Sequence, residues 1–272
     1  MKRITALFIV LLSAVSAFCL SGCVMISSTY NNSDRYSAGD REFDGGKVRS
    51  LDIEWESGSI EIIRHDADTV TITESCKSDL KEEQQVHSWL DGNVLRIRFC
   101  RSGEPFFFKM SEKKLEIKIP RDMVLDDLSC TSSSGDMLFK EISAETIDAN
   151  ASSGDMTIEQ KGESSSIKAA TSSGEIDITA EKTASVETAA SSGDITLRLE
   201  SMPDDVTAAT SSGNIKVCVP EDAGFTVKAA TASGDFDSDL PLTKEGSRYV
   251  YGNGKCEMEL AASSGDICIT YR

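Results

Sequence analysis

The sequence has 272 residues, with 45 Asp or Glu against 28 Lys or Arg, and a net charge of −17 at pH 7. Binding to nucleic acid depends on neutralising phosphates with Lys and Arg, so this charge argues against a nucleic-acid partner and against close adsorption to an anionic membrane. The acidity instead fits solubility and colloidal stability outside the cell.

Residues 1–22 have the features of a secretory signal peptide. Lys2 and Arg3 precede an apolar run from Ile4 to Val15, which is shorter than the ~20 residues that a membrane-spanning helix needs. The following Leu20-Ser21-Gly22-Cys23 resembles the lipobox of bacterial lipoproteins, which are cleaved before the cysteine and lipidated on its thiol. We therefore expect Cys23 to carry the lipid and to hold the protein at a membrane of the bacterial envelope, on its extracytoplasmic side. Loss of two basic and no acidic residues changes the net charge from −17 to −19.

Residues 23–46 are expected to form the lipidated N-terminus and a flexible tether. From residue 24 they are rich in Ser, Asn, Asp and Gly and contain few apolar residues, which is typical of a linker. An ordered strand near Tyr30 or Phe43 is the alternative. The folded domain is expected over residues 47–272.

Six cysteines follow Cys23, and an exported protein can form disulfides. Cys76 and Cys100 lie near the ends of two strand-like segments and are the candidate pair, with free thiols as the alternative. Because the chain has no CxxC motif and only two histidines, His65 and His87, no spacing supports a zinc or iron–sulfur site. We expect neither a metal nor a cofactor.

One segment recurs along most of the chain: small residues, a glycine, then Asp, Glu or Asn, then an apolar residue. Successive glycines of the seven clear copies are 19, 20, 19, 20, 21 and 31 residues apart. An eighth copy surrounds Gly58, 77 residues before the next one. The long intervals indicate insertions at 63–127 and 239–257. The seven glycines are Gly135, Gly154, Gly174, Gly193, Gly213, Gly234 and Gly265.

Apolar residues stand seven and five positions before each glycine, and two and four positions after it, with two polar exceptions at Thr188 and Ser238. Strand alternation therefore changes phase at Ser-Gly-Asp, which requires a turn or bulge there. A single copy buries too little apolar surface to fold alone, so the copies must stack. We predict an all-β parallel β-solenoid (β-helix) of about 20-residue coils. The alternative is an antiparallel sandwich of hairpins that turn at Ser-Gly-Asp.

Two segments of the first insertion break the alternation. Residues 78–90 combine helix-tolerant polar residues with a few apolar ones and predict a short helix or helical turn that ends at Asp91-Gly92. Phe106, Phe107 and Phe108 are predicted to lie in a loop, either as a lid over one end of the core or as a contact surface.

The acidic residues after the glycines could suggest calcium binding, polysaccharide binding or catalysis, but side chains of this kind also accept backbone N–H bonds and fix turns. The serines before the glycines have no histidine within the repeat to activate them, so a hydroxyl ladder that pairs backbone groups at the corner is the better account. We expect no catalytic residue and no enzyme. The acidic column consists of Asp136, Asp155, Glu175, Asp194, Asn214, Asp235 and Asp266.

The segment from Leu51 to Ile62, the sequence Leu-Glu-Ile-Lys-Ile-Pro from Leu115, and the serial Ser-Ser-Gly-Asp-Ile motif resemble the DUF4097 family of β-strand-repeat proteins, often labelled adhesins. The resemblance covers about residues 47–272. It implies a β-helical domain displayed at the bacterial envelope, with relatives in envelope-stress signalling and no catalytic residues. The six cysteines and the insertions at 63–127 and 239–257 depart from the family pattern.

Three functions follow from these features. The first is a non-enzymatic, lipid-anchored surface module that binds a protein or glycan through a solenoid face. The second is an envelope scaffold or stress-sensing component whose partner is a membrane protein. The third is a carbohydrate-active β-helix enzyme, which an acidic cluster in a long groove would favour.

Overall fold

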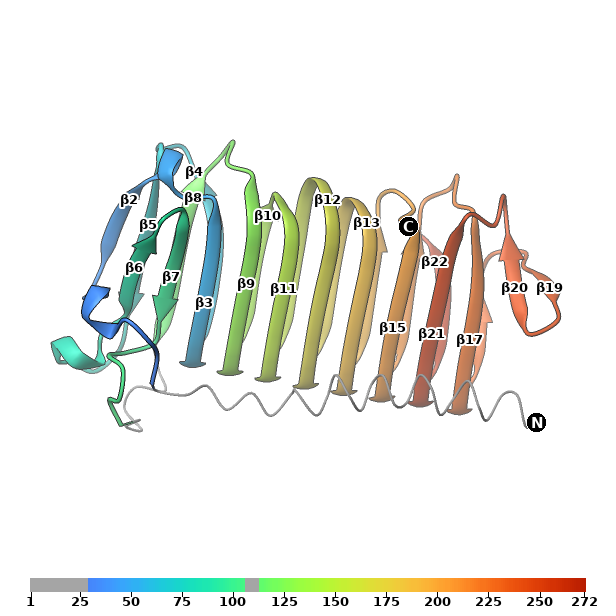
Figure 1. The fold of residues 1–272 in the computed structure, drawn as a ribbon. Helices are drawn as coiled ribbons and strands as arrows, with labels where there is room; N and C mark the ends of the chain where they lie inside the picture. The colour runs from blue at the N-terminus through green and yellow to red at the C-terminus, as the bar shows by residue number, and fades with distance from the viewer. Residues whose placement is uncertain (1–28, 106–112) are drawn as a thin grey trace.

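The computed structural model describes residues 29–105 and 113–272 (Figure 1). These residues form 22 β-strands and three short 3₁₀ helices. All 22 strands belong to one hydrogen-bonded sheet, so the predicted all-β class is confirmed. Within the described part of the chain, no helix has the length and apolar character needed to cross a membrane.

Each repeat copy contributes one strand to each of two columns, which enclose the core between them (Figure 1). The long strands β12 (Met156–Ser173) and β13 (Ile176–Ser192) run from the second column of one copy into the first column of the next. The first column also holds β3 (Ser50–Ser57), β9 (Leu125–Ser134), β11 (Ala144–Ser153), β15 (Asp205–Ser212), β17 (Phe225–Ser233) and β21 (Cys256–Ser264). The second holds β4 (Ser59–His65), β10 (Met137–Ile142), β14 (Ile195–Leu199), β16 (Ile215–Val219), β18 (Phe236–Ser238) and β22 (Ile267–Tyr271).

Neighbouring copies pair in parallel and in register. In the first column Ile167 lies opposite Ile147 on one side and Val186 on the other. In the second column Ile176 lies opposite Met156 and Ile195. Parallel pairing between copies excludes the alternative of stacked antiparallel hairpins.

The core follows the offsets that the sequence predicts. All seven residues that stand seven positions before a repeat glycine are at most 1% exposed. The residues two positions after the glycine are buried in the same way, apart from the half-buried Phe236 near one end. The residues seven positions before the glycines are Leu128, Ile147, Ile167, Val186, Val206, Val227 and Met258.

Two copies lie in the stack out of chain order. The Gly58 copy lies between β9–β10 and a further pair formed by β7 (Val94–Arg98) and β8 (Lys114–Pro120). The Gly265 copy lies between β15–β16 and β17–β18. At each end, the chain therefore skips over one copy, at residues 121–124 and 220–224. Part of the predicted first insertion is thus a member of the stack.

Antiparallel strands cover both ends of the stack, the C-terminal end only in part. At the N-terminal end, β5 (Thr69–Ser75) and β6 (His87–Asp91) pair with β8 and β7, and are followed outward by β2 (Arg41–Asp44) and β1 (Ser37–Ala38). At the other end, β20 (Arg248–Tyr251) pairs with β17, and β19 (Thr243–Glu245) pairs with β20. The outermost strands have only two to four residues, which limits the edge they offer to another chain. At the C-terminal end β20 pairs only with Phe225, Thr226 and Val227, so among the described residues no strand pairs with the outer side of β18 or of the rest of β17.

Two local predictions differ from the structure. The short helix or helical turn expected over 78–90 is limited to one 3₁₀ turn, η3 (Glu82–Gln84), and the segment continues into β6. Pairing with β7 overrides the local propensity, which is a weak determinant. The tether expected over 23–46 is ordered in its described part: it contains η1 (Ser33–Arg35), β1, β2 and η2 (Gly45–Lys47), and Phe43 packs against the core. The signal peptide, Cys23 and Phe106–Phe108 lie outside the described residues.

Candidate functional site

The repeat corner is built by close approach of neighbouring backbones. Gly193 has a φ of 141°, in the region that favours glycine, and a Cβ at this position would overlap the carbonyl oxygen of Gly174. The backbone pairing continues through the corner, since the Gly174 N–H donates to the Ser192 carbonyl oxygen at 3.0 Å. The corner is therefore a structural joint.

The acidic column forms a ladder of side-chain to backbone hydrogen bonds. Each acceptor oxygen takes the N–H of the residue at the same position in the neighbouring copy, so the carboxylates join copies instead of fixing their own turns. These groups are engaged in pairing, and the described residues contain no cluster of three or more His, Cys, Asp or Glu with metal-binding geometry. The donor-to-acceptor pairs are Asp155 to Asp136 (3.0 Å), Glu175 to Asp155 (2.8 Å), Asn214 to Asp194 (2.7 Å), Asp266 to Asn214 (2.9 Å) and Asp235 to Asp266 (2.9 Å).

The serine column takes part in the same joint mainly through its backbone. The carbonyl oxygens of Ser153, Ser173 and Ser192 accept the N–H groups of the neighbouring glycines at 2.9–3.0 Å. Their side chains lie at exposed positions of the corner. The ladder here is one of carbonyls, whereas the sequence suggested hydroxyls.

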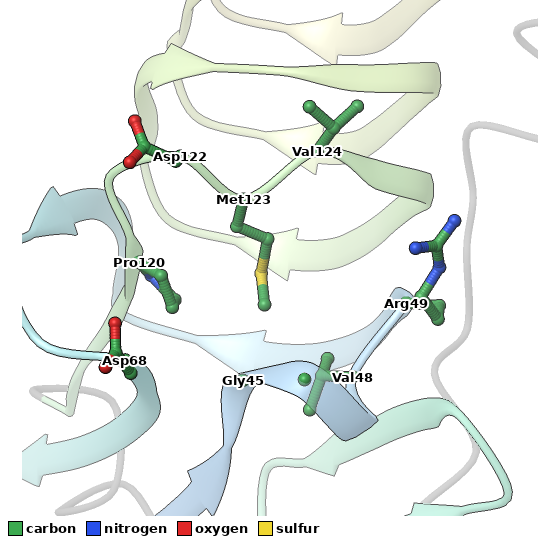
Figure 2. A pocket seen from close by; sticks show the side chains of 9 residues that line it. Gly45, Val48, Arg49, Asp68, Pro120, Asp122, Met123 and Val124 are labelled. Atoms are coloured by element: carbon green, nitrogen blue, oxygen red, sulfur yellow. The ribbon is translucent and has the colours of Figure 1, made fainter.

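A pocket of about 320 Å³ lies where residues 121–124 cross over the Gly58 copy; we call it the N-terminal crossover pocket. Met123 extends towards Gly45 and Val48, and Val124 stands at its rim (Figure 2). Val124 is 57% exposed. Gly45 permits close packing here, because a Cβ would overlap the carbonyl oxygen of Asp68. The lining residues are Gly45, Gly46, Val48, Arg49, Asp68, Pro120, Asp122, Met123 and Val124.

The second crossover, at residues 220–224, carries a more polar pocket of about 160 Å³, the C-terminal crossover pocket. Its wall includes Asp204, whose carboxylate lies 3.9 Å from the Lys255 ammonium, and Glu200, which pairs with Arg272 at 2.7 Å. Tyr271, 42% exposed, precedes Arg272. Its hydroxyl lies 2.9 Å from that of Tyr251. Tyr271 does not line this pocket; it ends β22 opposite Val219, directly before the crossover.

A buried ion pair connects the stack to the antiparallel strands β1, β2, β5 and β6, which we call the N-terminal cap. The Lys113 ammonium is fully buried and lies 2.5 Å from a carboxylate oxygen of Glu74, whose side chain is 6% exposed. It also donates to the carbonyl oxygens of Gln84, at 2.9 Å, and Phe99, and faces the ring of Trp55. Burial lowers the pKa of Lys113 and raises the pKa of Glu74, and the opposite charge of each residue reduces the pKa shift of the other. Three acceptors match the three N–H donors of an ammonium, which fits a structural tie.

The candidate disulfide residues both lie at this cap. Cys100 is buried, and burial raises the pKa of its thiol to about 12, so the thiol stays protonated and unreactive. Cys76 is half-buried at the end of β5, and both cysteines are close enough to Lys113 to affect its pKa. The structure holds the six described cysteines as thiols. The pairing of Cys76 with Cys100 stays a prediction.

Sequence reasoning missed Met123, Val124 and the ion pair of Lys113 with Glu74. The pocket depends on the order of copies in the stack, which the repeat does not encode. The only signal was the short apolar run Met123-Val124-Leu125 between Asp122 and Asp126. For the ion pair, the signal was a lysine that directly precedes an alternating strand.

The family pattern of Toastrack DUF4097 matches residues 48–161 and 121–270 of this chain. No curated protein matches the sequence. A proposed adhesin from Bacteroides fragilis is 12% identical, with 86% of this chain and 96% of that chain covered and a TM-score of 0.47. A second proposed adhesin, from Parabacteroides distasonis, is 13% identical over 84% of this chain and 95% of that chain, with a TM-score of 0.45.

A proposed cell adhesion protein from Clostridium sporogenes is 12% identical over 86% of this chain and the whole of that chain, with a TM-score of 0.34. The two family matches overlap and together extend over most of the chain, from the first repeat strand to the last. The protein therefore belongs to the Toastrack DUF4097 family.

Proposed function

We propose that this protein is a non-enzymatic, lipid-anchored component of the bacterial envelope that displays an adhesin-like binding module. The module is a parallel β-solenoid in which each copy adds one coil; the parallel register between copies supports this interpretation. Its partner is a protein or a glycan outside the cytoplasm. Cys23 carries the lipid, as the lipobox-like sequence before it suggests.

The observation that supports binding is the position of the exposed apolar side chains. Within the described residues, Val124 and Tyr271 are the large apolar side chains that are exposed; Val124 lies in the first crossover, and Tyr271 lies opposite Val219, directly before the second. The rest of the outer surface is dominated by charged and short polar residues, many of them in ion pairs between copies, such as Lys168 with Glu187 at 3.1 Å. Exposed apolar groups on a polar surface mark contact sites.

The N-terminal crossover pocket is the stronger candidate for the partner contact. It offers an apolar rim, formed by Met123 and Val124, with Arg49 and Asp122 beside it (Figure 2). Arg49 is itself paired with Asp126 at 2.8 Å, so a partner would meet a positioned guanidinium. An apolar anchor with a few fixed polar groups is the usual composition of a binding site.

Site-specific photo-crosslinking on intact cells tests this proposal. A photoreactive residue at position 124 should capture a defined partner, whereas one at Thr157, on the outer face of β12, should capture none. Equal capture at the two positions, or no capture at either, would argue against a binding role for this pocket.

Anchoring is tested separately, because Cys23→Ala should release the protein from membranes washed with carbonate.

The alternative of a scaffold or stress-sensing component with a membrane-protein partner is favoured by one observation. The described chain begins to pack on the domain at Tyr30, so only six residues separate this point from Cys23. Such a short link would keep the domain near the membrane surface, within reach of the extracytoplasmic part of a membrane protein. The same crosslinking experiment distinguishes the two, since the captured partner would then be membrane-embedded.

A further inference from the structure

Residues 29–40, which we call the strap, run over the outer face of the N-terminal end of the stack. Their ring contacts lie on β6 and β7: the Tyr30 and Tyr36 ring centroids are 4.6 Å apart, and the Tyr36 ring meets Trp89 at 5.6 Å. Beneath both tyrosines lies the Arg98 guanidinium, 6.0 Å from the Tyr30 ring and 5.9 Å from the Tyr36 ring. The strap therefore binds at a specific site on β6 and β7, which we call its seat.

Ion pairs within the stack also hold this guanidinium. The Arg98 side chain is 6% exposed and is held by the Asp52 carboxylate at 3.0 Å and by Glu54 at 3.2 Å. Because a paired guanidinium keeps its planar face available, it can still stack against aromatic rings. The tyrosines thus dock on a guanidinium that carboxylates of β3 hold in place.

Hydrogen bonds fix the two ends of the strap. At the first end, the Tyr30 hydroxyl donates to the Cys100 carbonyl oxygen at 2.9 Å, and the Tyr30 N–H donates to the Ser102 hydroxyl at 2.9 Å. At the second end, β1 makes two residue pairs with β6, and the Gly39 N–H donates to the Val86 carbonyl oxygen at 2.8 Å.

The strap is attached more weakly than the segment that follows it. Every residue of the strap and of β2 is exposed or half-buried, so burial class does not separate them. They differ in pairing: β1 makes two residue pairs with β6, whereas β2 makes four with β5 and its Phe43 packs against the core. Segments with few buried contacts open at low free energy. The strap can therefore separate while β2 and the stack remain intact.

We propose that the strap is a releasable clasp that holds the membrane anchor against the N-terminal end of the stack and sets the distance of the domain from the bilayer. This inference rests on the proposed lipidation of Cys23. With the strap bound, seven residue steps link Cys23 to Tyr30, a reach of about 25 Å at ~3.5 Å per residue. With the strap released as far as Arg41, eighteen steps give about 60 Å.

The clasp also decides which end of the molecule faces the bilayer. The strap lies at one end of the stack, and the β19–β20 hairpin lies at the other (Figure 1). A net charge of −19 after signal removal, derived from the −17 of the full chain, disfavours lying flat on an anionic surface. The hairpin end therefore points outward, and release of the strap moves the whole module further from the membrane.

The test uses the full lipidated chain on a supported bilayer of phosphatidylethanolamine and phosphatidylglycerol. Neutron reflectometry measures the gap between bilayer and domain, and hydrogen exchange measures the protection of the Gly39 amide. The variant is Tyr30→Ala/Tyr36→Ala, and Tyr271→Ala at the opposite end is the control. We expect the double variant to about double the gap and to lose Gly39 protection, with wild type and control unchanged and the thermal unfolding of the stack retained.

An unchanged gap and unchanged Gly39 protection in the double variant would overturn the clasp. A wild-type gap well beyond 25 Å with Gly39 protected would overturn the role of the strap in setting the distance. If the wild-type chain does not bind the bilayer, the proposed anchoring fails and the distance-setting role fails with it. Exchange at Gly39 in soluble Cys23→Ala protein then still reports whether the strap binds its seat.

Discussion

The side chain that follows each repeat glycine decides whether a corner bond to the neighbouring copy forms. Asp and Asn at this position accept the N–H of the next copy at 2.7–3.0 Å. Glu175 is longer by one methylene, and among the described residues its carboxylate makes no bond with the Asp194 N–H. The ladder is therefore interrupted between the Gly174 and Gly193 copies.

Shortening this side chain should restore the ladder. We expect Glu175→Asp to raise the free energy of unfolding by about 1 kcal/mol, the typical net value of one such hydrogen bond. Chemical denaturation of the purified protein measures the change. The matched control is Asp194→Glu, which removes the bond to the Asn214 N–H and should lower stability by a similar amount. A change of the same sign in both variants, or no change in either, would show that the ladder bonds contribute nothing.

The corner also shows why the chemistry of a residue column could be predicted from the sequence while its bonding partners could not. The phase change of the apolar residues required a turn at Ser-Gly-Asp, and acceptor side chains are expected at turns. The sequence contains no information on whether Asp136 binds its own turn or the neighbouring copy. Only the stack, with Asp155 N–H 3.0 Å away, selects the partner.

At the scale of elements, the two end caps attach to the stack by different means. The C-terminal hairpin is held by strand pairing and by aromatic contacts such as Phe236 with Tyr249 at 5.0 Å. The N-terminal cap adds the ion pair between Lys113, which leads into β8, and Glu74 on β5. Buried ion pairs are costly to break one side at a time, because the remaining charge is left without a partner.

Removing one partner should therefore be much worse than removing both. We expect Lys113→Met to lower the free energy of unfolding by about 3–5 kcal/mol, and Lys113→Met/Glu74→Leu to recover most of this loss. Lys182→Met, which breaks the exposed pair with Glu163, serves as control and should cost less than ~1 kcal/mol. Urea unfolding of the four proteins measures these values. A double variant as unstable as the single one would contradict the buried-charge explanation.

The pH dependence of the single variant follows from the same pair. Burial raises the pKa of Glu74, and Lys113 opposes this shift, so its loss raises the pKa further. In the variant the folded state then binds a proton more tightly than the unfolded chain, in which a Glu has a pKa near ~4.3. Stability of Lys113→Met should be retained below that value and lost as the pH rises through the pKa of the folded state.

The elements of the repeated copies could be predicted from the sequence. Elements whose position depends on how the chain is connected through the stack could not. The copies from Gly135 to Gly213 share apolar columns, so their strands and core positions follow from the sequence. The pair β7–β8 lacks the Ser-Gly-Asp corner, because residues 99–113 intervene, and so it was assigned to an insertion. The predicted helix failed at β6 for a related reason: its pairing partner β7 is provided by tertiary structure.

For the whole molecule, the two crossovers make the stack different from a chain that simply adds one copy after another. Every copy presents the same register to its neighbours: Leu260 of β21 lies opposite Ala208 on one side and Ala229 on the other. The copies are therefore interchangeable as neighbours, and the order in the stack is decided by the connections. The same connections create the pockets on which the proposed binding function depends.

Truncation tests this interchangeability. Deleting residues 256–272 removes the Gly265 copy from inside the stack and leaves β15–β16 facing β17–β18 across a gap of one strand spacing, ~4.8 Å. Because both faces carry the same glycine corner and matching apolar columns, we expect the gap to close, with Ala208 opposite Ala229. The loop at 220–224 already spans two spacings and needs to span only one after closure.

Hydrogen exchange and small-angle scattering measure the outcome. Closure predicts that the amides of β15 and β17 stay protected and that the molecule shortens by about one strand spacing of ~4.8 Å. The matched control is deletion of residues 241–254, which removes the hairpin and keeps the Gly265 copy in place; it should leave β15 fully protected. If β17 and β18 lose protection in the first truncation, the register between copies is insufficient for pairing, and the Gly265 copy is required to hold the C-terminal end on the stack.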